Sequence, residues 1–175
     1  SNMQAIINAC KARTLQASPA VVISNNSDSG ALARAKREGL PHYHLSSRTH
    51  PDAQELDQAI LNAMLEHSVE IITLAGYMKK LGPRTLSHFQ GRILNIHPAL
   101  LPKFGGKRMY GRHVHEAVIA SGETESGVSI HLVDAAYDTG PILAQSRVIV
   151  KPTDTAETLA ARVLQREHLL VSESE

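Results

Sequence analysis

Apolar residues recur along this chain in two patterns, one typical of amphipathic helices and the other of buried strands. Helical spacing extends over residues 3–10, 31–37, 52–66, 113–121 and 155–168. Apolar runs bounded by turn residues predict strands at 20–24, 43–45, 69–75, 92–95, 127–133 and 142–150. Because strands and helices alternate through short connections, we expect one α/β domain, with a mostly parallel twisted sheet and helices on both faces.

The strand at 92–95 leads into the run Asn95-Ile96-His97-Pro98, which carries the most distinctive chemistry of the chain. Side chains two residues apart on a strand share a face, so Asn95 and His97 should project together, with Ile96 on the other side. Pro98 has no N–H group to continue a sheet ladder, so the strand should end there. Ligands of open α/β sheets bind at such carboxyl ends. Together with Asp138 in the turn at 137–141, this pattern predicts an acyl-transfer site.

Each of these three residues also has an ordinary structural interpretation. Asn95 suits a turn, His97 a hydrogen-bonded loop, and the Asp-Thr-Gly-Pro sequence around Asp138 is common turn chemistry. The residues alone leave both interpretations open.

Composition narrows the class of protein. A chain of 175 residues with 42% hydrophobic content can bury one core. Its apolar runs are far shorter than the ~20 residues of a membrane-spanning helix, and no signal segment opens the chain, so we expect a cytoplasmic location. Cys10 is the only cysteine, which excludes an internal disulfide and fits a reducing compartment.

The charge and the histidine content bear on two further classes, nucleic-acid-binding proteins and metal-binding proteins. The net charge is +1, and two Phe, four Tyr and no Trp offer little for stacking on bases, so nucleic-acid binding has little support. Ten histidines suggest a metal site, with His42/His44 and His113/His115 as candidate pairs. Neither pair has a third ligand at a recognisable spacing, so we expect no metal.

Four segments resemble glycinamide ribonucleotide formyltransferases, the folate-dependent enzymes of purine synthesis. They are NIHPALLPKFGG at 95–106, AGYMKKL at 75–81, YDTGPI at 137–142 and SNMQAII at 1–7. The similarity runs through essentially the whole chain, 1–175, as one formyltransferase domain. It implies 10-formyltetrahydrofolate as the formyl donor and glycinamide ribonucleotide as the acceptor. It also implies that a first, central strand precedes Ser1 and that a C-terminal part follows residue 175.

The resemblance assigns catalytic roles to Asn95, His97 and Asp138. Formyl transfer to an amine passes through a tetrahedral oxyanion, to which Asn95 and His97 would donate hydrogen bonds. Asp138 would pair with His97, favour its imidazolium form, and accept the amine proton directly or through water. His131 matches a family histidine near the site, and a supporting role and a core position are equally compatible with it.

The resemblance also implies two sets of binding residues. Ser1 and Asn2 at a helix start would bind the substrate phosphate, since helix N-termini attract anions. Glu167 matches a glutamate that binds the ribose hydroxyls, although alone it would be a solvated helix residue.

Folate binding is implied for a second region. Met78, Lys79 and Leu81 would hold the pterin largely through backbone groups, in a pocket walled by Val133. Without the resemblance, Met78 and Leu81 would be core residues. The basic loop 103–111 could contact the phosphate or be a mobile solvated loop.

Three rival functions differ in the acceptor or in catalysis itself. A formyltetrahydrofolate hydrolase has a related Asn-x-His motif but uses water as the acceptor. A methionyl-tRNA formyltransferase needs a further RNA-binding domain. A non-catalytic folate- or nucleotide-binding homologue would bind without turnover. A homodimer is compatible with the sequence.

Overall fold

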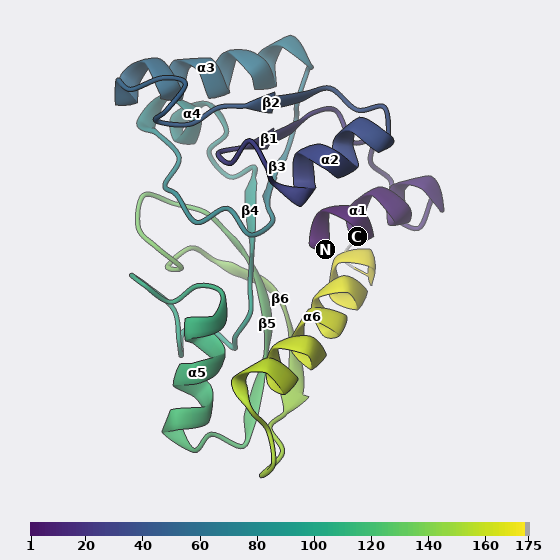
Figure 1. Cartoon of the computed structure of the whole chain (residues 1–175), viewed down its shortest axis with the longest axis vertical. Helices are drawn as coiled ribbons and strands as arrows, with labels where there is room; N and C mark the ends of the chain where they lie inside the picture. Colours follow the sequence, from purple (N-terminus) through teal and green to yellow (C-terminus); the bar gives the residue numbers. More distant parts are fainter. Residues whose placement is uncertain (174–175) are drawn as a thin grey trace.

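The computed structural model describes residues 1–173 as alternating helices and strands (Figure 1). In chain order they are α1 (Asn2–Lys11), β1 (Val22–Ser24), α2 (Gly30–Arg37), β2 (His42–His44), α3 (Ala53–Glu66), β3 (Ile72–Leu74), α4 (Pro83–His88), β4 (Ile93–His97), α5 (Arg112–Ser121), β5 (Glu125–Leu132), β6 (Ile142–Ile149) and α6 (Ala156–Glu173).

Every helix and strand expected from the sequence is present, with differences at the ends. β3 covers only residues 72–74 of the apolar run at 69–75, and α6 continues five residues past the expected end at 168. The short helix α4 was not predicted. β4 continues through His97 and ends before Pro98, where the missing N–H was expected to end it.

The strands form two sheets. β1 and β2 make a parallel pair, whereas β3, β4, β5 and β6 form a four-stranded sheet in that order. β3 and β4 are parallel, and β5 and β6 extend the sheet by antiparallel pairing. The expected α/β class is therefore confirmed, with antiparallel strands added at one edge.

Within the described residues, β1 and β3 do not pair with each other. Val22 N–H donates to Pro41 O and Leu45 N–H to Ser24 O, so the backbone groups of Ile23 point away from β2. Thr73 likewise points away from β4, because its neighbour Ile72 donates to Arg92 O. The space between these strands is lined by Ile23 and Thr73 and is continuous with the cavity described below.

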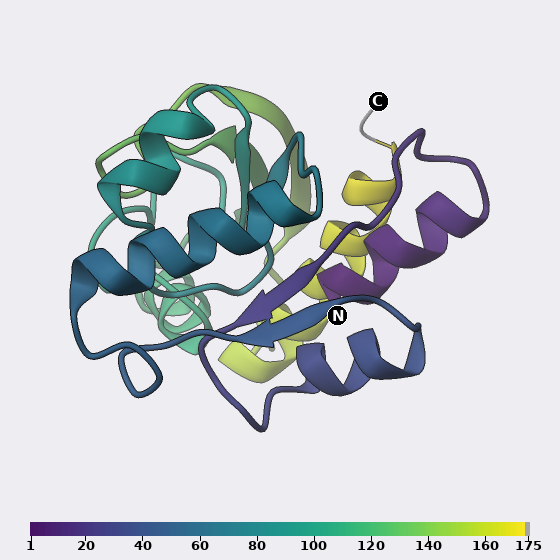
Figure 2. The ribbon, with the colours of Figure 1, turned by 90° about the horizontal axis from the view of Figure 1, so that it is seen from above.

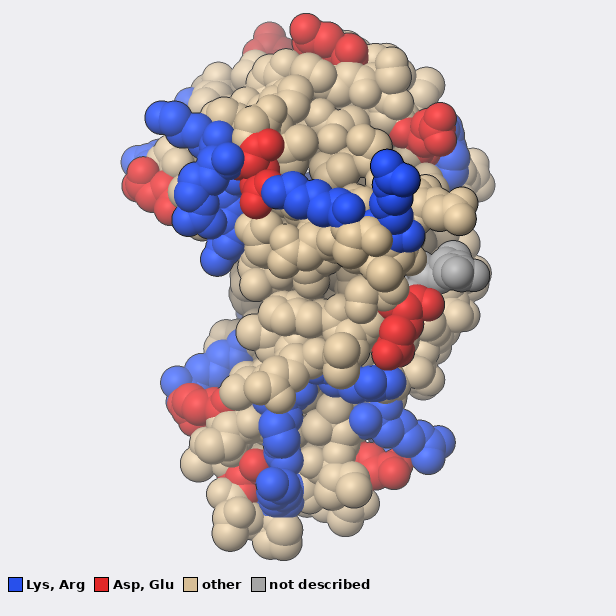
Figure 3. All heavy atoms as spheres, turned by 90° about the vertical axis from the view of Figure 1, so that its right-hand side faces the viewer, with Lys and Arg blue, Asp and Glu red and all other residues tan. Residues whose placement is uncertain are grey.

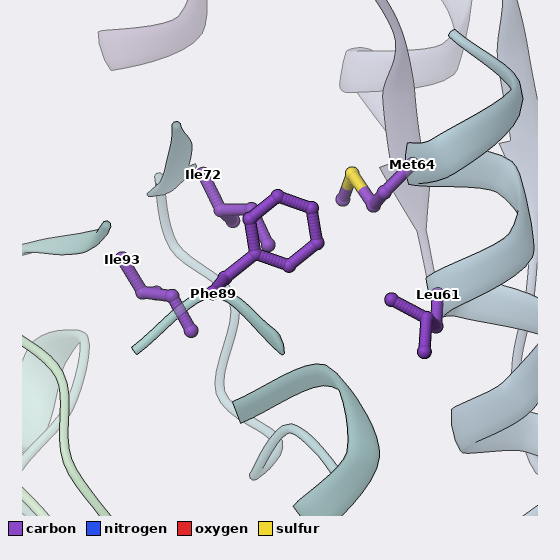
Figure 4. Close-up of a cluster of buried hydrophobic side chains, with 5 residues drawn as sticks. All are labelled: Leu61, Met64, Ile72, Phe89 and Ile93. Atoms are coloured by element: carbon purple, nitrogen blue, oxygen red, sulfur yellow. The ribbon is translucent and has the colours of Figure 1, made fainter. Parts of the chain in front are cut away.

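β4 is covered on both faces, as expected. On one face, Ile93 joins a core cluster that comprises Leu61, Met64, Ile72 and Phe89, from α3, β3 and the end of α4 (Figure 4). On the other face, Ile96 packs against Val128 of β5 and Val171 of α6. Since residues 93, 95 and 97 share a face, Asn95 and His97 lie on the side of the strand that α3 covers.

The first and last helices of the chain pack against each other. α1 lies beside α6, as Figure 1 and Figure 2 show. The face shown in Figure 3 has acidic side chains beside each group of basic ones, and the outline narrows between the upper and lower parts. In residues 1–173, no helix is both long and apolar enough to cross a membrane.

Candidate active site

The carboxyl end of β4 places an amide and an imidazole beside β5. In the antiparallel register, Asn95 lies opposite His131 and His97 opposite Ser129. Opposite residues on one sheet face are close enough to interact. Asn95 Nδ2 is 3.0 Å from His131 Nε2. The position of His131 therefore follows from strand pairing.

Asp138 reaches this pair from the loop between β5 and β6. Its Oδ1 lies 3.7 Å from His97 Nδ1, 3.4 Å from His131 Nε2 and 3.5 Å from Asn95 Nδ2. Its backbone has φ +55°, a left-handed conformation that Asp tolerates better than most residues. Gly140 permits the tight return of the loop, because a Cβ there would lie 1.8 Å from Leu132 O. The four polar side chains thus converge, as the sequence predicted for Asn95, His97 and Asp138.

Electrostatics keeps the Asp138 carboxylate charged. Burial alone would raise its pKa, but the hydrogen bond from His131, the Gly106 N–H donated to Oδ2 at 2.8 Å, and the nearby histidine charges hold the pKa below its usual value. Asp138 is therefore an anion and a proton acceptor at neutral pH.

Two opposing effects act on the charge of the buried His97. Only 3% of the residue is exposed, and burial lowers its pKa more than Asp138 and the Phe104 carbonyl raise it. The Asp138 charge favours the imidazolium form, as expected, but desolvation of the ring outweighs this attraction, so the pKa of His97 is lowered overall. His97 Nε2 lies 2.8 Å from Phe104 O, and since a carbonyl only accepts, Nε2 carries hydrogen.

The 103–111 loop contributes backbone groups that sequence reasoning missed. Phe104 O accepts from His97, and Gly106 N–H donates to Asp138, so the loop is tied to both groups. Gly106 has φ +96°, which favours glycine. The Gly-Gly pair was the only available signal, because backbone groups leave no side-chain motif. The basic side chains of Lys107 and Arg108 are exposed.

The predicted phosphate and ribose residues lie together at the junction of α1 and α6. Ser1 caps α1, accepting from Gln4 N–H at 3.4 Å. Asn2 Nδ2 donates to Glu167 Oε2 at 2.6 Å. Glu167 is 7% exposed, and burial raises its pKa although the Asn2 bond opposes this effect. This glutamate is a buried group, unlike the solvated residue that its helix position alone suggested.

Most of the predicted folate-binding residues line a cavity, whereas one lies in the core behind them. Met78 is 52% exposed and lines the cavity, as do Lys79 and Leu81. Leu81 and Val133 pack against the core cluster of Figure 4, and Val133 is not among the residues that line the cavity. Sequence reasoning missed Lys80, whose Nζ donates to Ala135 O at 3.1 Å and lies 4.6 Å from the Tyr137 ring centroid.

One cavity of about 2600 Å³ joins these groups. Its lining includes Asn95, His97 and Asp138, together with Asn2 and Glu167, and it continues between β1 and β3. Its size exceeds the roughly 300–1,000 Å³ of a typical ligand pocket. Among residues 1–173, no group of three or more His, Cys, Asp or Glu side chains has the geometry to hold a metal ion.

Comparison with known proteins decides the family. The formyl transferase family model matches residues 1–174. The chain belongs to the formyl transferase family. It is 42% identical over 99% of its length to the chloroplastic phosphoribosylglycinamide formyltransferase of Vigna unguiculata, and spans 55% of that protein. It is 35% identical over 97% of its length to the Escherichia coli phosphoribosylglycinamide formyltransferase, and spans 78% of it.

Solved structures agree with this family assignment. The crystal structure of phosphoribosylglycinamide formyltransferase from Brucella melitensis matches with a TM-score of 0.89 at 40% identity, covering 99% of this chain and 86% of that one. The overall fold of this formyl transferase is therefore shared with a solved enzyme over nearly its whole length.

Proposed function

We propose that this formyl transferase moves the formyl group of 10-formyltetrahydrofolate to the amine of glycinamide ribonucleotide, a step of purine synthesis. The observation that carries the proposal is the convergence of Asn95, His97 and Asp138 on a cavity that also reaches Asn2 and Glu167. The names of the similar enzymes support the same reaction.

The proposed reaction is a direct transfer without a covalent enzyme intermediate. The amine nitrogen attacks the formyl carbon, and the carbonyl oxygen becomes an oxyanion. The bond from that carbon to folate N10 then breaks, N10 gains a proton, and the attacking amine loses one. Tetrahydrofolate and the formylated nucleotide result.

The protein groups have separate roles in this scheme. Asn95 Nδ2 donates to the oxyanion; loss of one such donor typically slows a reaction ~10²–10³-fold. His97 Nε2–H is held by Phe104 O, so His97 donates through Nδ1 only when protonated, a state that the developing oxyanion favours. Asp138, whose pKa is held low, accepts the amine proton directly or through water.

We assign binding roles to two sets of residues, one for the nucleotide and one for the folate. We assign the substrate phosphate to the N-terminus of α1 at Ser1 and Asn2, where N–H groups and the helix dipole favour an anion. Glu167, aligned by Asn2, accepts from the ribose hydroxyls. The folate lies against Met78, Lys79 and Leu81, with Val133 behind them in the core. Three expectations stay predictions: a single formyltransferase domain over 1–175, a cytoplasmic location and a homodimer.

The first test is nucleotide dependence. We expect tetrahydrofolate to form from 10-formyltetrahydrofolate only when glycinamide ribonucleotide is present, as followed by absorbance. Formation without the nucleotide would establish the rival hydrolase, and binding of both ligands without turnover would establish a non-catalytic homologue. Lys36, exposed on α2, gives a matched surface control as Lys36→Gln, whereas Asp138→Asn should lower the rate by at least ~10²-fold.

A further inference from the structure

In each of the two buried histidines of the site, one ring nitrogen forms a hydrogen bond with a backbone carbonyl. His97 Nε2 lies 2.8 Å from Phe104 O, and His131 Nδ1 lies 2.9 Å from Leu132 O. Because carbonyl oxygens only accept, these two nitrogens carry hydrogen. In the neutral rings, His97 Nδ1 and His131 Nε2 are therefore acceptors.

The Asn95 amide is bound at the centre of this arrangement. Its Nδ2 lies 3.0 Å from His131 Nε2 and 3.5 Å from Asp138 Oδ1. With His131 neutral, both Nδ2 hydrogens face these acceptors. Within the described chain, Oδ1 has no hydrogen-bond partner, and Asn95 lines the cavity. The amide thus has no free N–H for a formyl oxygen in this state.

Protonation of His131 reverses the preferred orientation of the Asn95 amide. Nε2 then becomes a donor, and a donor cannot face Asn95 Nδ2 at 3.0 Å. A half-turn of the amide about its terminal bond places Oδ1 on His131 Nε2–H and exchanges the positions of the two amide atoms. The half-turn loses the long Nδ2 contact to Asp138 and brings the amide oxygen near Asp138 Oδ1. The positive charge of the protonated ring, whose Nε2 lies 3.4 Å from Oδ1, offsets this repulsion.

We propose that the protonation state of His131 selects the orientation of the Asn95 amide, and that only protonated His131 frees the Asn95 N–H groups for the formyl oxygen. This inference rests on the proposed function for its catalytic consequence. His131 is thereby a positioning residue that acts through Asn95.

The surroundings of His131 favour its charged form near neutrality. The residue is 2% exposed, and burial lowers its pKa. The Asp138 hydrogen bond, the Leu132 carbonyl and the charges of Asp138 and Asp134 outweigh burial and raise the pKa above its ordinary value. From β4, His97 is the one other titratable neighbour, and its charged form repels that of His131. From β6, the residue opposite His131 is the apolar Ile142.

The pH dependence of the rate distinguishes positioning from a merely structural role. Because His97 must also be protonated, the rate has a pH dependence of its own, and above the pKa of His131 the wild-type rate should fall by about a further tenfold per pH unit, the contribution of a single ionisation. In His131→Gln, the side-chain amide places a permanent N–H donor where Nε2–H lay, so the variant should stay active and lose this alkaline fall. His131→Leu, which offers no donor, should be slow at every pH. A His131→Gln variant that keeps the wild-type alkaline fall would overturn the proposal.

Nuclear magnetic resonance of the free protein tests the switch without turnover. With ¹⁵N-labelled histidine and asparagine, the Asn95 side-chain amide resonances should shift with the same midpoint as His131 Nε2, and should not shift in His131→Gln. Asn95 resonances that stay constant while His131 titrates would contradict the proposal. A coupled titration in a protein that shows no nucleotide-dependent transfer would uphold the switch and refute the proposed function.

Discussion

At the scale of single residues, the site depends on which buried groups are charged. The pKa values of three groups that lie together are shifted in different directions. Those of His97 and Asp138 are lowered, and that of His131 is raised. The proximity of Asn95 and His97 was predictable, since both lie on one face of one strand. The sign of the His97 shift was not, because it depends on burial by residues far away in the sequence.

His115 gives a residue-scale prediction about stability. It is 5% exposed, and burial, with the charge of His97, lowers its pKa. As pH falls through the unfolded value of about 6.5, the unfolded chain gains a proton that the folded protein does not, so the free energy of unfolding decreases by up to ~1.4 kcal/mol per pH unit for such a group. In urea titrations at pH 7.5 and 5.5, His115→Leu should therefore lose less stability than the wild type.

His113 provides the matched control on the same helix. It is exposed, so His113→Leu should follow the wild-type change between the two pH values. His131, with its raised pKa, acts oppositely: its contribution is present below about pH 6.5 and is lost as pH rises through the folded value. Equal pH dependence of His115→Leu and the wild type would show that His115 is protonated in the folded protein.

At the scale of secondary structure, α4 is the helix that was not predicted, and its N-terminus shows why. Its N-cap is Gly82, which has no capping side chain. Asp57, in the middle of α3, accepts instead from Arg84 N–H at 2.7 Å and from Thr85 N–H at 3.1 Å. These are the bonds that an N-cap residue normally makes. Since the capping group lies 25 residues earlier in the sequence, no local pattern could indicate the helix.

This cap yields a prediction at the same scale. Asp57 is 3% exposed and also accepts from the Thr85 hydroxyl at 2.7 Å. Asp57→Ala should lower the free energy of unfolding by about 3 kcal/mol, because it leaves buried donors unsatisfied. Asp52→Ala, which removes the exposed cap of α3, should cost about 1 kcal/mol. Urea denaturation with similar losses for both variants would contradict the special role of Asp57.

At the scale of the whole molecule, the succession of helices and strands along the chain was predicted better than the architecture around the cavity. Alternating apolar runs indicated the α/β class, and the end of β4 indicated the site. The antiparallel edge of β5 and β6, which brings His131 opposite Asn95, depends on long-range pairing that local patterns do not encode. The same holds for the joining of α1 to α6, which sets Asn2 against Glu167.

The fate of the formyl carbon tests the central claim most directly. The protein would be mixed with glycinamide ribonucleotide and 10-formyltetrahydrofolate labelled with ¹³C in the formyl group, and the products followed by ¹³C resonance. The account predicts that the label appears in a formamide on the nucleotide, and that Asp138→Asn slows this appearance by at least ~10²-fold. Label released as formate, at a rate independent of the nucleotide, would contradict it.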